Sequence, residues 1–77
     1  MRDYVKAQGI KVDRAQLDLL VPAFEAACRM AERRLGPRQN LRQIRGRLAQ
    51  MVVDLVIAGG MTDPEAIAEA AIRRALP

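Results

Sequence analysis

The stretch LRQIRGRLAQMVVDLVIA, residues 41–58, decides the fold. Its apolar side chains recur at steps of three and four residues, the spacing of one face of an α-helix, and this face consists of Leu41, Ile44, Leu48, Met51, Val52, Leu55 and Ala58. From Met51 onward only Asp54 is polar, so this half of the helix is apolar on nearly every side. Such a helix has to be covered on every side. The stretch therefore predicts a buried helix in an all-α fold.

Another helix is predicted before this stretch, over residues 13–35. It begins with Asp13 and Gln16, which have the spacing of a capping box, and a glycine and a proline directly after residue 35 end it. Pro22 lies inside the helix and lacks a backbone N–H donor, so we expect a kink or a break there. The expected core face consists of Leu17, Val21, Phe24, Cys28, Ala31 and Leu35.

A third helix is predicted over residues 63–76. Thr62 and Glu65 have the spacing of a capping box, and Pro64 suits the first helical turn. Two arginines near its end suit the negative end of the helix dipole. The expected packing face consists of Ile67, Ala68, Ala71, Ile72, Ala75 and Leu76.

The remaining segment, residues 1–12, shows no clean period. It predicts a short helix or an extended arm, with a break at Gly9. Asn40, with Gln43 three residues later, is the expected start of the helix over residues 41–58. The 77 residues are thus expected to form one domain, a three-helix bundle-like all-α fold with a short N-terminal arm.

The residue types of the chain argue against catalysis. There is no His, Ser or Trp, and Cys28 is the only cysteine. Nucleophilic catalysis usually pairs Ser, Cys or Thr with a base, most often His, and zinc sites need several Cys or His ligands. Cys28 lies on an apolar helical face and is interpreted as a small buried hydrophobe. We expect a protein that is not an enzyme and holds neither a metal nor a cofactor.

Self-association is the expected remedy for so small a core. A chain of this size buries only roughly 60% of its unfolded surface, and its core rarely supplies more than about 3–5 kcal/mol. One cysteine cannot form an internal disulfide. A homodimer is therefore predicted through the helix over residues 41–58, with a candidate interface of Ala49, Val53, Val56 and Ile57. The alternative is that the N-terminal arm covers this side within the chain.

Positive charge is concentrated between residues 29 and 47, where seven arginines face one acid, Glu32. Six of them form a candidate anion or nucleic-acid patch, namely Arg33, Arg34, Arg38, Arg42, Arg45 and Arg47. Arginine forks suit phosphate oxygens. The alternative is a solvated face with ion pairs such as Glu25 with Arg29 at helical spacing.

These patterns favour a small non-enzymatic protein-interaction module, a regulator or adaptor that acts as a homodimer. The alternative function is nucleic-acid binding through backbone contacts of the arginine patch. Base readout by a helix-turn-helix is disfavoured, because the start of the last helix carries Asp63, Glu65 and Glu69. The N-terminus lacks the pattern of a secretory signal, and no apolar stretch is long enough to span a bilayer. We therefore expect a cytoplasmic protein with no membrane partner.

Overall fold

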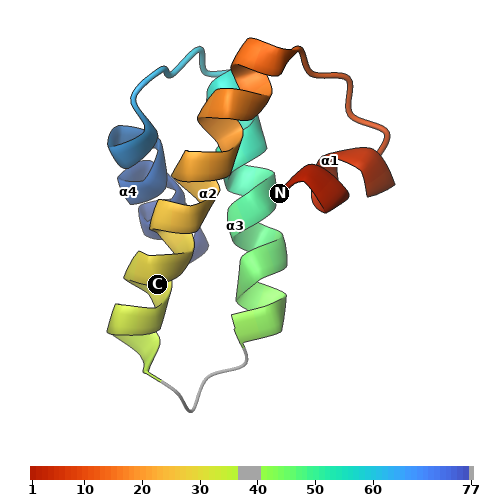
Figure 1. Cartoon of the computed structure of the whole chain (residues 1–77). Coiled ribbons are helices and arrows are strands. Elements are labelled where there is room, and N and C mark those ends of the chain that lie inside the picture. The colour runs from red at the N-terminus through yellow and green to blue at the C-terminus, as the bar shows by residue number, and fades with distance from the viewer. Residues whose placement is uncertain (37–40, 77) are drawn as a thin grey trace.

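The computed structural model describes residues 1–36 and 41–76, and this part contains helices and no strand (Figure 1). Its elements are α1 (Arg2–Ala7), α2 (Arg14–Leu35), α3 (Leu41–Ile57) and α4 (Pro64–Ala75). The expected all-α class is confirmed. The described residues contain four helices where three were predicted, because the N-terminal segment adopts the short helix rather than the extended arm.

The three long helices pack side by side, while α1 lies beside α3 (Figure 1). The chain runs along α2, returns along α3 and descends again along α4, so α2 and α4 point the same way. The 22 residues of α2 span about 33 Å, and the molecule measures 35 × 24 × 17 Å. One helix therefore connects the two ends of the molecule.

The start of α2 is fixed by the predicted capping box. The Asp13 carboxylate accepts a hydrogen bond from the Gln16 backbone N–H at 2.7 Å, and the Gln16 side-chain oxygen accepts one from the Asp13 backbone N–H at 3.1 Å. Two backbone donors that no helical carbonyl can reach are thus satisfied. The capping-box prediction at this helix is confirmed.

The start of α4 differs from the sequence prediction. Its N-cap is Asp63, whose side chain makes no capping hydrogen bond, and the predicted box of Thr62 and Glu65 is wrong. Pro64 is the reason: it occupies the first helical position and keeps the residue before it extended. The helix thus begins one residue later than predicted, and Ala66 takes the place where a box needs Glu or Gln.

These two helix starts give the first prediction. Asp13→Ala should lower the free energy of unfolding by about 1 kcal/mol, because it removes a capping acceptor. Thr62→Ala should change it by less than about 0.5 kcal/mol, because Thr62 is exposed and caps nothing. Urea titrations followed by circular dichroism measure both values. An equal loss in the two variants would contradict the assigned helix starts.

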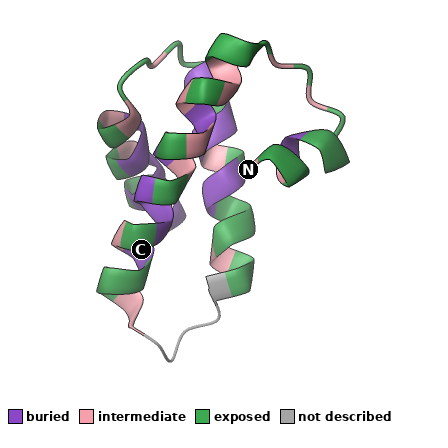
Figure 2. Ribbon diagram, in the orientation of Figure 1, coloured by how far each residue is buried: buried purple, intermediate pink, exposed green. Residues whose placement is uncertain are grey.

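The core lies between α2, α3 and α4 (Figure 2). The core face predicted for α2 is wrong in part, because only Cys28 and Ala31 of that face are buried and the other four members are half-buried. The buried face is a neighbouring stripe of mostly small side chains, namely Leu20, Ala23, Ala26, Ala27, Cys28 and Ala31.

Alanines of α4 explain why this stripe of α2, and not the predicted one, is buried. Ala68, Ala71 and Ala75 are buried against the core, together with Ile67 and Ile72. Small side chains on both partners let two helix axes come close, and close packing gains many weak attractive contacts. A bulky stripe would hold α2 and α4 apart. The alanine stripe of α2 is therefore the one that turns inward.

Pro22 does not break α2, which continues from Arg14 to Leu35. Of the two outcomes predicted there, the structure excludes the break. Pro22 and Asp18 are both exposed. Pro22 lacks the N–H that would bond to the Asp18 backbone carbonyl, and at an exposed position water can replace that donor.

Candidate nucleic-acid interface

Exposed arginines lie at the end of α2 and at the start of α3, which meet at one end of the molecule, and in the last turn of α4, which ends beside the second half of α2 (Figure 1). We call this surface the basic end, and it consists of Arg33 and Arg34 from α2, Arg42, Arg45 and Arg47 from α3, and Arg73 and Arg74 from α4. Five of the six predicted patch residues belong to it. The sixth, Arg38, lies outside the described residues.

Two members of the basic end were missed by the sequence prediction, namely Arg73 and Arg74. From the sequence alone, their position is explained by the helix dipole, since both are cations in the last turn of α4, at its negative end. The topology adds a second consequence, because α2 and α4 point the same way and the shorter α4 ends beside the second half of α2. Arg34 and Arg73 indeed line the same groove. The signal that could have found them is the alternating direction of three sequential helices joined by short loops.

Five of the seven arginines of the basic end are not paired with a carboxylate of the described residues. Among the described residues, Arg33, Arg34, Arg47, Arg73 and Arg74 form no ion pair with a carboxylate, although all five are exposed. The predicted pairing of Glu25 with Arg29 is also not formed. Unpaired guanidinium groups keep their hydrogen-bond donors available for an external anion.

Arg45 on α3 lies close to Cys28, a buried free cysteine on α2. Burial raises the pKa of the Cys28 thiol, and the positive charge of Arg45 only partly offsets this effect. The thiol is therefore protonated near neutral pH, which makes it a poor nucleophile.

A shallow groove runs between α2 and α4 at the basic end. It has a volume of about 240 Å³ and is lined by Met30 and Arg34 from α2 and by Glu69, Ile72 and Arg73 from α4. Ile72 is buried and Met30 half-buried, so they form its apolar part. The two arginines approach the groove from different helices.

The predicted dimer interface on α3 is largely covered within the chain. Ala49, Val53 and Val56 are only 2%, 5% and 7% exposed, whereas Ile57 is 43% exposed. The covering of α3 includes α1, whose Tyr4 hydroxyl donates to the Gln50 side-chain oxygen at 2.7 Å. Val5 of α1 belongs to the same core cluster as Val53 and Val56.

This covering removes the reason to require a second subunit at that face. The apolar second half of α3 is surrounded by α2, α4 and the N-terminal helix of its own chain. Three long helices alone would leave the α1 side of α3 open. The interface residues predicted from the sequence are therefore core residues, apart from Ile57.

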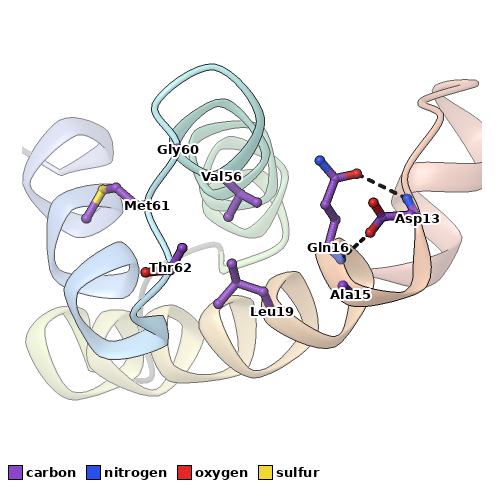
Figure 3. A pocket seen from close by; sticks show the side chains of 8 residues that line it. All are labelled: Asp13, Ala15, Gln16, Leu19, Val56, Gly60, Met61 and Thr62. Atoms are coloured by element: carbon purple, nitrogen blue, oxygen red, sulfur yellow. Dashed lines mark hydrogen bonds between the residues drawn. The ribbon is translucent and has the colours of Figure 1, made fainter.

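An open apolar pocket lies at the other end of the molecule, where α2 starts and α3 ends (Figure 3). It has a volume of about 370 Å³, and Leu19, Val56 and Met61 supply its largest apolar side chains. The capping box of α2 and Thr62 form its polar rim. This end carries carboxylates at both helix starts, from Asp13, Asp63 and Glu65. Lys11 and Arg14, which flank Asp13, also lie at this end, so it carries charges of both signs, whereas the basic end carries a large excess of arginines.

Among residues 1–36 and 41–76, no group of three or more His, Cys, Asp or Glu side chains could hold a metal ion. No helix in this part of the chain is both long and apolar enough to cross a membrane. No model of a known protein family matches the chain, and neither a curated protein nor a solved structure matches it.

Proposed function

We propose that this chain is a non-enzymatic nucleic-acid-binding domain that holds the phosphate backbone of a duplex at its basic end. The observation that carries the proposal is the set of exposed arginines on three helices of the basic end, of which Arg33, Arg34, Arg47, Arg73 and Arg74 form no ion pair with a described carboxylate. Because guanidinium groups donate in a planar fork, they match phosphate oxygens better than lysine does. The net charge of +4 favours the same class of ligand.

The distribution of charge supports a defined binding orientation. The acidic end, with Asp13, Asp63 and Glu65, lies at the far end of α2 from Arg33 and Arg34. Lys11 and Arg14 offset part of this negative charge, so a polyanion is attracted more strongly to the basic end than to the acidic end. In this orientation the start of α4 points away from the nucleic acid, so α4 cannot act as a recognition helix.

The residue types at the basic end favour contacts to a duplex backbone. The described residues that form the basic end include no aromatic side chain. Tyr4 lies on α1, away from this end. Single-stranded nucleic acid is usually held by stacking its bases on aromatic rings. Arginine contacts to phosphates fix the position of a duplex without reading its sequence. We therefore expect little sequence preference.

Fluorescence anisotropy with fluorescein-labelled 20-base-pair DNA duplexes tests this function. If about four phosphates are contacted, the association constant should fall about a hundredfold between 50 and 200 mM salt. Two duplexes of unrelated sequence should bind with affinities within about threefold of each other. Absence of binding at low salt, or binding that salt does not weaken, would exclude the proposal.

A protein-interaction role, as regulator or adaptor in a homodimer, is the second candidate. The open apolar pocket and the exposed Ile57 favour it, because both offer apolar surface outside the core. Ile57→Lys would then shift a dimer towards monomer in sedimentation equilibrium. A wild-type chain that stays monomeric over the whole concentration series would remove the homodimer from this candidate.

A further inference from the structure

The groove between α2 and α4 has features that the rest of the basic end lacks. Arg34 and Arg73 line it from two different helices, so their guanidinium groups can act on one anion from two sides. Its volume of about 240 Å³ leaves room for a phosphate group with its hydration. Arg33 and Arg74, the sequence neighbours of these arginines, are exposed and do not line the groove.

The two helices hold this groove in a fixed shape. Ile72 in its wall is only 1% exposed, and Ala31 and Ala75 are buried in the same core cluster. Because α2 and α4 are packed through small side chains, the core fixes the separation of the backbone positions that carry Arg34 and Arg73. Both side chains are exposed, so an anion has to order them when it binds.

The apolar part of the groove strengthens the electrostatic attraction. Met30 and Ile72 displace water from one side of the space between the arginines. Charges interact more strongly where less water screens them. Because Arg34 and Arg73 are themselves exposed, solvent and salt still screen the part of their charge that lies outside the groove.

Glu69 is the unfavourable member of this groove. It precedes Arg73 by four residues, which is the spacing of a helical ion pair, yet no ion pair is formed between them. Its carboxylate lies in the wall of the groove. A bound phosphate would therefore be attracted by two arginines and repelled by one glutamate.

We infer that the groove between α2 and α4 is the principal phosphate seat of the domain, in which Arg34 and Arg73 hold one phosphodiester group and Glu69 weakens its binding. This inference rests on the proposed function, since the phosphodiester belongs to the duplex backbone. The seat differs from the rest of the basic end in that two helices act on one phosphate.

A matched pair of double variants tests the seat. Arg34→Gln/Arg73→Gln and Arg33→Gln/Arg74→Gln remove the same charge from adjacent positions of the same two helices. Binding of the labelled duplex at 50 mM salt should weaken about tenfold more in the first pair than in the second, because only the first pair supplies charge-assisted bonds to one phosphate. Equal losses of duplex affinity in the two double variants would overturn the proposed phosphate seat and leave the proposed function standing.

Removal of the Glu69 charge should have the opposite effect on duplex binding from removal of the arginines. Glu69→Gln should tighten duplex binding about threefold, since it removes one repulsive charge beside the phosphate. Glu65→Gln, on the same helix but at the acidic end, should leave binding unchanged. Weaker or unchanged binding in Glu69→Gln would contradict its assigned role. Vesicles containing phosphatidylserine are measured in parallel, and wild-type binding to them without duplex binding would overturn both proposals.

Discussion

Leu20→Ala should leave much of the protein unfolded at 25 °C, whereas Leu17→Ala, three residues earlier in the same helix, should leave it folded. Leu20 is fully buried between the long helices, with 0% of its side chain exposed. Truncation of a buried leucine costs about 2–5 kcal/mol. Since a core of this size supplies about 3–5 kcal/mol in total, the loss is comparable to the whole stability.

Leu17 is the matched control, because both substitutions change the same residue type in the same helix. It is half-buried and lies outside the core cluster, so its truncation should cost less than about 1 kcal/mol. Urea unfolding followed by circular dichroism at 222 nm gives both free energies. If Leu17→Ala is the more damaging change, the face predicted from the sequence is the buried one, and the packing of α2 described above is incorrect.

Local chemistry explains which features could be predicted from the sequence. The capping box of Asp13 and Gln16 depends on two residues and the backbone between them, so its spacing was a sufficient signal. The same rule failed at Thr62 because Pro64 moved the helix start by one residue. A proline next to a cap is thus stronger evidence for the start than the box is.

Which face of a helix is buried depends on the helices that pack against it. Two adjacent stripes of α2 are apolar, one of bulky side chains such as Leu17 and Val21 and one of alanines. Periodicity favoured the bulky stripe, since larger side chains gain more from burial. The buried alanines of α4 reverse that choice, and they can be recognised only once the pairing of α2 with α4 is known.

The candidate site was predictable in part for the same reason. Arginines close together in the sequence, such as Arg33 and Arg34, were identified by their local concentration. Arg73 joins them only through the parallel direction of α2 and α4. The sequence did not show whether a second subunit or the chain's own N-terminal helix covers this face of α3. Residues 1–12 carry no clean period, so the N-terminal helix was not predicted as the cover.

Reversal of three charges at the basic end should abolish measurable duplex binding. The variant Arg33→Glu/Arg34→Glu/Arg73→Glu changes the net charge from +4 to −2, since each replacement changes it by two units. It removes up to three phosphate contacts, so the slope of log K against log salt should fall by about three. The association constant at 50 mM salt should fall more than about a hundredfold, because the new carboxylates also repel the phosphates.

The control variant separates a binding surface from a general effect of charge. Arg2→Glu/Lys6→Glu/Arg14→Glu makes the same change in net charge, at exposed positions of α1 and at the start of α2. These positions lie away from the basic end, so only long-range attraction weakens, and salt at 150 mM screens it beyond about 8 Å. The control should therefore retain most of its duplex binding at that salt. Equal losses in the two variants would mean that net charge, and not the arrangement of arginines by α2, α3 and α4, governs the interaction.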